Sequence, residues 1–151
     1  MIVDVSHLSD RGFWDIAEHS TRPFAASHSN CRALAPHCRN LTDEMIRVMA
    51  EKGGLVGLNY CSGFLDDQPR PELCRSTTAL MARHAAHFKQ VGGIEIIGLG
   101  SDFDGIPTNP ALPSAEAMPV LWDRLKTAGF TENQLDGIFW GNVMRVYRDA
   151  L

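Results

Sequence analysis

Short apolar runs alternate with longer amphipathic segments along this chain. The apolar runs are typical of buried β-strands, and they cover residues 1–7, 23–28, 55–60 and 95–100. Helical periodicity follows each of them, and we expect helices to begin at Ser9 or Asp10, Thr42, Ser76, Ser114 and Thr131. Glycine pairs at 53–54 and 92–93 are predicted to end two of these helices, and Gly141 is a candidate break in the last one.

This order of elements predicts an α/β fold. Strands that alternate with helices should lie parallel in one sheet. Four such units correspond to half of a (β/α)8 TIM barrel, or to a small open sheet. A four-stranded sheet alone would leave two unpaired edges. We therefore expect a TIM-barrel type of fold in which this chain supplies about four βα units, a half barrel.

Polar side chains end three of the predicted strands. His7 and His28 each follow a serine at a strand end, and Asp102 directly follows the run at 96–101. The carboxyl ends of parallel strands open onto one face, and neutral imidazole is a common zinc ligand. These three residues therefore predict a metal-dependent hydrolytic site. Asp104 is a weaker candidate, which would either orient a metal-binding side chain through a hydrogen bond or simply belong to a turn.

Five other residues carry weaker signals. Arg39, with Arg32 as its competitor, lies in the loop after His28 and would suit a substrate carboxylate. Asp4 lies among apolar neighbours, so it needs a buried partner or a supporting role in the site. His84 shares a helix face with His87, and packing or surface roles are expected for both.

Charge and cysteine content narrow the class. The net charge is -4 and the basic residues are scattered, which argues against partners such as nucleic acid or an anionic membrane. No apolar stretch approaches the roughly 20 residues of a membrane span, and we expect no secretory signal. The four cysteines form no CxxC pair, so we expect reduced thiols and a cytoplasmic location.

Taken together, these segments resemble the zinc dipeptidases of the membrane (renal) dipeptidase family, peptidase family M19. The resemblance spans the whole chain in the family order. It rests on Asp4–His7, Ala26–Ser29, Arg39–Asn40, Val56–Tyr60, Gly98–Gly105 and Gly141–Val146.

The resemblance implies a (β/α)8 barrel with two zinc ions, bridged by a glutamate and by a water or hydroxide that attacks the carbonyl of a dipeptide. His7 and His28 look like the two histidines that hold one zinc. Arg39 looks like the residue that grips the terminal carboxylate of the substrate. Asp102 looks like the acid/base that manages the proton on the leaving amine.

One departure from the family is large. Relatives carry an N-terminal His-x-Asp pair, the bridging glutamate and a further histidine, whereas no His-x-Asp occurs here. Residues 1–151 therefore resemble only the C-terminal half of such an enzyme, as a truncation, an alternative gene start or a split protein. We expect one zinc ion or none to be fully held by this chain. Cys61, where many relatives have an aromatic residue, is a smaller departure.

Three functions remain open from the sequence. The first is an incomplete zinc dipeptidase with little activity of its own. The second is a non-catalytic half barrel that assembles with a missing N-terminal half or with a second copy. The third is another two-zinc amidohydrolase, and the contribution of Arg39 to dipeptide binding discriminates it from the first.

Overall fold

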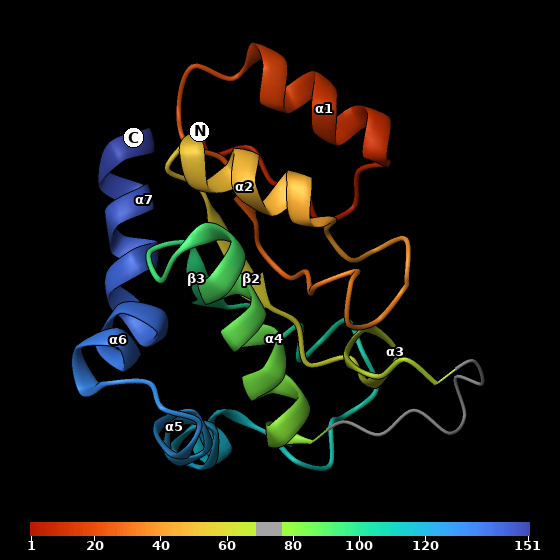
Figure 1. The fold of residues 1–151 in the computed structure, drawn as a ribbon, viewed down its shortest axis with the longest axis vertical. Helices are drawn as coiled ribbons and strands as arrows, with labels where there is room; N and C mark the ends of the chain where they lie inside the picture. The colour runs from red at the N-terminus through yellow and green to blue at the C-terminus, as the bar shows by residue number, and fades with distance from the viewer. Residues whose placement is uncertain (69–76) are drawn as a thin grey trace.

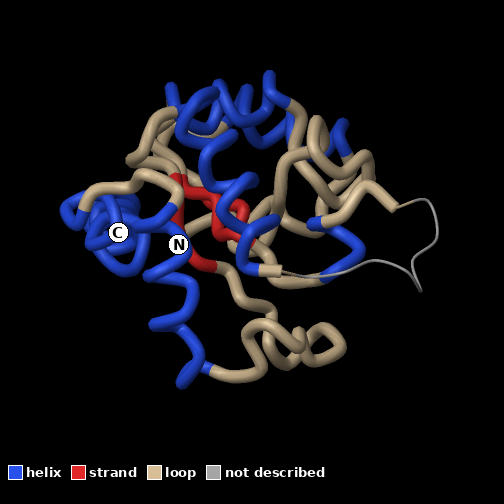
Figure 2. The backbone as a smooth tube through the Cα atoms, turned by 60° about the horizontal axis from the view of Figure 1, so that its bottom comes forward, coloured by secondary structure: helices blue, strands red, loops and turns tan. Residues whose placement is uncertain are grey.

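The computed structural model describes residues 1–68 and 77–151, and it has the expected α/β architecture. Its strands are β1 (Ala25–Ala26), β2 (Leu55–Leu58) and β3 (Ile97–Leu99). They form a parallel three-stranded sheet in the order β1-β2-β3, surrounded by helices (Figure 2). The predicted parallel order of these strands is therefore confirmed. Ser76, the expected start of a helix, and Cys74 lie outside the described residues.

The prediction of a full strand over residues 1–7 is wrong. Only Asp4 forms a bridge, parallel to Ala25. Val5 N–H donates to Ala25 O at 2.8 Å, and Ala25 N–H donates to Val3 O at 2.9 Å. A turn then closes through Leu8 N–H and Val5 O at 3.0 Å. The segment thus continues the sheet beside β1 for one bridge before it turns away towards the first helix.

The helices agree with most of the cap signals. They are α1 (Asp10–His19), α2 (Asp43–Glu51), α3 (Ser62–Leu65), α4 (Thr78–Gly92), the 3-10 turn η2 (Ala115–Ala117), α5 (Met118–Thr127), α6 (Glu132–Asp136), the π-helical turn η3 (Gly137–Gly141) and α7 (Asn142–Ala150). Side chains of Ser9, Thr42 and Thr131 cap α1, α2 and α6 as expected. Thr77 caps α4.

Two helix predictions need correction. Ser114 makes no side-chain cap bond, and a 3-10 turn precedes α5 there. Gly141 does not break the last helix. The chain passes from α6 through the π-helical turn directly into α7, because the glycine keeps helical dihedral angles. Within the described ranges, none of the helices is long and apolar enough to cross a bilayer.

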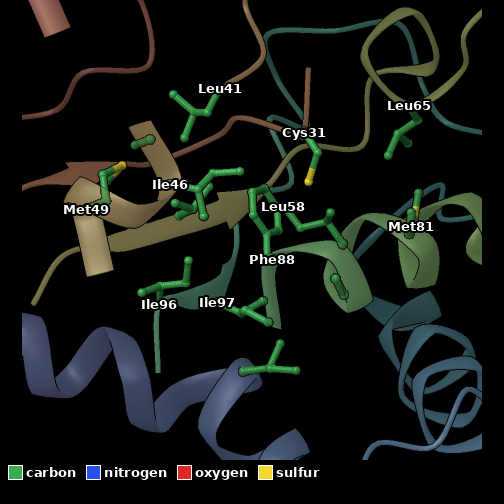
Figure 3. Packing of buried hydrophobic residues seen from close by; sticks show 14 of the residues in the cluster. Cys31, Leu41, Ile46, Met49, Leu58, Leu65, Met81, Phe88, Ile96 and Ile97 are labelled. Atoms are coloured by element: carbon green, nitrogen blue, oxygen red, sulfur yellow. The ribbon is translucent and has the colours of Figure 1, made fainter. Parts of the chain in front are cut away.

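The core lies between the sheet and the helices α2 and α4. Ile46 of α2, Leu58 of β2, and Phe88 of α4 are all fully buried and approach one another in Figure 3. Trp14, which we expected on the buried stripe of α1, is instead 38% exposed, and Phe13 beside it fills the core position. The sequence periodicity therefore predicted this helix correctly, but fewer of its apolar side chains are buried than the sequence indicates.

Helix α7 fastens the starts of the strands. Asn142 donates to Ile94 O at 2.9 Å and Ile97 O at 2.8 Å. Arg145 donates to Gly53 O at 2.6 Å, ahead of β2, and to Glu95 O at 3.0 Å, ahead of β3. The helix runs alongside β3, and the two chain termini lie close together (Figure 1). The opposite, carboxyl end of the sheet is thus left open for a site.

Candidate functional site

Two imidazoles meet beyond the carboxyl end of the sheet. His28 follows β1, and His7 follows the segment that pairs with β1. Their Nε2 atoms lie 2.9 Å apart, and their ring centroids 4.9 Å apart. Residues 21 positions apart in the sequence are therefore brought to one point by adjacent parallel segments. The expectation that both side chains reach the same end of the sheet agrees with this geometry.

Polar neighbours contact the Nδ1 atom and the backbone N–H of His28. Ser27 Oγ lies 2.7 Å from His28 Nδ1, and the His28 N–H donates to Ser6 Oγ at 3.0 Å. Asp4 accepts the Ser27 N–H at 2.9 Å and the Ser6 N–H at 3.0 Å. A Cβ on Gly57 would collide with Ser27 O, so only glycine allows β2 to approach this closely. The backbone around Ser27 is therefore fixed.

Burial and nearby charged groups shift the pKa of His28. Burial lowers the pKa of His28, and the nearby Arg39 and His7 lower it further, while the carboxylates of Asp102 and Asp4 oppose the shift. Burial raises the pKa of Asp4, but the hydrogen bonds from Ser27 and Ser6 outweigh it, and the net shift is downward. A neutral imidazole next to ionised carboxylates is the state that a metal ligand requires.

The structure separates the two candidate arginines. Arg32 makes a two-pronged ion pair with Asp10, with both contacts at 2.7 Å, and its Nε donates to Asn40 O. Arg39 Nη2 instead lies 3.4 Å from His7 Nε2, and its guanidinium lies 5.7 Å from the centroid of the Phe64 ring. Only Arg39 therefore directs its charge towards the imidazole pair.

Asp102 has an unusual backbone. Its φ of 59° lies in the left-handed region, which is uncommon for a residue other than glycine and is frequent at functional sites. Its Oδ2 accepts a hydrogen bond from Asn59 Nδ2 at 3.2 Å, and a Cβ on Gly105 would collide with its Oδ1. Asp104 is exposed and makes no hydrogen bond within the described part of the chain. The structure thus places Asp102 beside the imidazoles, whereas nothing ties Asp104 to them.

A buried amide cluster was missed by the sequence reasoning. Asn30, Asn40 and Asn59 are fully buried. Asn59 N–H donates to Asn30 Oδ1 at 3.0 Å, and Asn30 N–H donates to Asn40 Oδ1 at 3.2 Å. The cluster connects the loops after β1 and β2 and ends at Asp102. An asparagine inside the apolar run 55–60 was the available signal, since a buried amide requires partners.

The two helical histidines have structural contacts. His84 is buried, and its ring bonds to Cys31 N–H at 3.0 Å and Leu65 O at 3.1 Å. His87 pairs with Asp43 at 2.7 Å. Both therefore pack within the fold, as expected. Cys31, Cys38 and Cys61 are free thiols.

The imidazole pair fits one zinc ion in part. Two nitrogens on a tetrahedral zinc lie about 3.3 Å apart, given zinc–nitrogen bonds of about 2.0 Å. The observed 2.9 Å needs only a small opening to reach that separation. Among residues 1–68 and 77–151, no three His, Cys, Asp or Glu side chains are grouped closely enough to hold an ion. These residues thus supply part of a ligand set.

Comparisons with known proteins agree on one family. The model of the membrane dipeptidase family, peptidase family M19, matches residues 1–151. An uncharacterized Klebsiella pneumoniae protein from the pqqA 5' region is 38% identical over 150 residues, which is 99% of this chain and 55% of the relative. Dipeptidase 3 of Macaca fascicularis is 31% identical over 153 residues, 99% of this chain and 30% of that protein.

A solved structure is also similar. It is a metallo peptidase from Rhodobacter sphaeroides, liganded with a phosphinate mimic of the dipeptide L-Ala-D-Ala. It matches with a TM-score of 0.91 and 30% identity over 98% of this chain and 42% of that one. The chain therefore spans about half the length of these relatives, or less. Because the family model covers it from end to end, the chain belongs to the membrane dipeptidase family, peptidase family M19.

Proposed function

We propose that this chain carries the C-terminal half of the active site of a zinc-dependent dipeptidase. One observation carries the proposal: the Nε2 atoms of His7 and His28 converge to 2.9 Å, with Arg39 at 3.4 Å from the same point. Family membership supports hydrolysis of a peptide bond. The phosphinate mimic of a dipeptide in the Rhodobacter sphaeroides structure supports a dipeptide as the substrate class.

Each residue has a definite task in this proposal. His7 and His28 hold a zinc ion, which when bound polarises a carbonyl and acidifies water. Arg39 binds the carboxylate of the substrate, because its guanidinium has no carboxylate partner within the described residues. Asp102, oriented by Asn59, moves the proton on the leaving amine. Asp4 supports His28 from behind.

The site is shared between this chain and a second segment. Two imidazoles are fewer ligands than a zinc ion needs, and the relatives are about twice as long or longer. We propose that the missing ligands come from an N-terminal half, which together with this chain closes a (β/α)8 barrel. A site that takes a non-peptide amide in the same way is the remaining alternative.

Zinc content and dipeptide hydrolysis test this proposal together. The chain is assayed alone and after mixing with the N-terminal half of the Klebsiella pneumoniae relative, produced as a separate polypeptide. We expect at most one weakly held zinc ion and little turnover for the chain alone, and turnover in the mixture. Arg39→Ala should raise the dipeptide KM at least about tenfold, a loss of about 1.4 kcal/mol in binding.

Arg148→Ala is the matched control, because Arg148 is exposed on α7, away from the imidazoles. Full turnover by the lone chain would contradict a shared site. An unchanged KM and kcat in Arg39→Ala would remove the support for a dipeptide substrate.

A second candidate function, an assembly module without catalysis, is favoured by the surface of α7. An exposed apolar stripe at helical spacing runs from Trp140 in η3 along α7 through Met144 and Tyr147 to Leu151. An open pocket of about 430 Å³ lies between this helix and the sheet, and Ile2, Leu55 and Val143 are among its lining residues. Such a surface is typical of a contact between polypeptides.

A further inference from the structure

Three side chains form a continuous line behind the imidazole pair. Ser27 Oγ contacts Asp4 Oδ2 on one side and lies 2.7 Å from His28 Nδ1 on the other. The far nitrogen of the same ring, His28 Nε2, lies 2.9 Å from His7 Nε2. The line therefore leads from a carboxylate to the nitrogen that faces the proposed metal position.

The direction of these hydrogen bonds follows from counting protons. The Asp4 carboxylate also receives the backbone N–H groups of Ser27 and Ser6, so it acts only as an acceptor. The single hydroxyl proton of Ser27 must then point towards Asp4. Ser27 Oγ has only lone pairs left for His28, so His28 Nδ1 must carry a proton and donate it.

Ser6 does not change this assignment. Its hydroxyl accepts the backbone N–H of His28 at 3.0 Å and lies 3.5 Å from Ser27 Oγ. If the Ser6 hydroxyl donates to Ser27 Oγ, the proton of Ser27 is directed even more firmly towards Asp4. Ser6 thus supports the same direction of donation.

We propose that Asp4 and Ser27 are positioning residues that fix the tautomer of His28, with the proton on Nδ1 and the lone pair of Nε2 directed to a divalent cation shared with His7. The inference rests on the proposed metal site and adds how one of its ligands, His28, is held in the tautomer that can bind a cation. His7 Nε2 faces both His28 Nε2 at 2.9 Å and the Arg39 guanidinium, which can only donate, at 3.4 Å, so the assignment of the His28 proton comes from the Ser27 side of the ring alone.

Nitrogen-15 NMR of the histidine rings tests this directly. In the metal-free chain near pH 7.5, we expect His28 to show a protonated Nδ1 and an unprotonated Nε2. Ser27→Ala should convert His28 to a mixture of tautomers, and Ser27→Thr, which keeps the hydroxyl, should restore the original one. Titration with Co²⁺ against a chelator should show affinity about 10 to 100 times weaker for Ser27→Ala and close to that of the original chain for Ser27→Thr.

Ser29→Ala is the matched control on the other side of His28. The Ser29 hydroxyl is buried and has no hydrogen-bond partner within the described part of the chain. This substitution should leave both the tautomer and the Co²⁺ affinity unchanged. Asp4→Asn provides a second test, since an amide that can donate removes the reason for Ser27 to point away from His28.

The outcomes separate this inference from the proposed function. A proton on His28 Nε2 in the original chain would overturn the inference, whatever the variants do, and so would an unchanged tautomer in a folded Ser27→Ala or Asp4→Asn variant. The expected tautomer without any Co²⁺ binding would support the hydrogen-bond line and count against the metal site itself.

Discussion

At the residue scale, polar side chains near the strand ends do most of the positioning, and some of them are buried while others are exposed. The sequence indicated Asp4, His7, His28 and Asp102, because each interrupts or ends an apolar run. It could not separate Arg39 from Arg32, since the ion pair of Arg32 with Asp10 joins a loop to a helix that the sequence does not align. The sequence indicated that Asn59 needs partners, but not which ones, since its bonds connect loops about 30 residues apart.

His84 should make the stability of the fold sensitive to acid. Burial lowers the pKa of His84 to about 4, against an ordinary value near 6.5 in the unfolded chain. Between these values the unfolded state binds more protons, so the free energy of unfolding should fall as the pH drops from about 6.5 to 4. The loss approaches about 3 kcal/mol at pH 4.

Urea unfolding at several pH values between 7.5 and 4.5 measures this loss. His84→Gln keeps a donor and an acceptor but does not titrate, so its free energy of unfolding should vary much less over this range. His19→Gln, at an exposed position on α1, is the control and should keep the original pH dependence. Equal slopes for His84→Gln and the original chain would show that the acid sensitivity arises elsewhere.

At the element scale, helix starts were easier to predict than strand lengths. A cap such as Thr131 with Gln134 is decided within four residues, and both bonds of that capping box are present. Strand ends depend on which partner continues to pair. β1 is only Ala25–Ala26 because the backbone N–H groups of Ser27 and His28 donate to the side chains of Asp4 and Ser6 instead of to a neighbouring strand. Residues 1–7 pair with β1 at one bridge.

Arg145 fastens α7 to the sheet, and its removal should weaken the whole fold. Arg145→Ala breaks bonds to Gly53 O at 2.6 Å and Gly54 O at 3.1 Å, which are left partly buried. We expect a loss of about 2–3 kcal/mol in the free energy of unfolding, measured by urea denaturation. Among the described residues, the Arg148 side chain bonds only to Met144 O within its own helix, so Arg148→Ala should change the free energy of unfolding by less than about 0.5 kcal/mol. If Arg145→Ala lowered the free energy of unfolding no more than Arg148→Ala does, the hydrogen bonds of Arg145 would not stabilise the sheet.

At the scale of the whole molecule, the sheet has open edges and helix α7 has an exposed apolar face. The sheet has β3 at one edge and the single Asp4 bridge beyond β1 at the other. The apolar stripe of α7 and the cavity beside it lie near the chain termini. These surfaces are consistent with relatives that are about twice as long or longer.

The stripe on α7 should be needed for assembly with an N-terminal half. Met144→Glu combined with Tyr147→Glu should abolish the complex with the separately produced half of the Klebsiella pneumoniae relative in sedimentation velocity, because charge at the contact is costly to desolvate. The Tm of the lone chain should change little, since both side chains are about half exposed. Val120→Glu, on the exposed face of α5, is the control. A complex that persists in the double variant would rule out this face as the contact.

The sequence by itself determined the features that depend on near neighbours. Periodicity and caps predicted the helices, and polar residues after apolar runs marked the strand ends that carry His7, His28 and Asp102. Only the tertiary structure decided what those ends meet. The 2.9 Å approach of the imidazoles, the hydrogen-bond line through Ser27 and the choice of Arg39 over Arg32 all depend on contacts between distant segments. Such contacts follow from how the sheet and loops pack, which no local pattern of residues specifies.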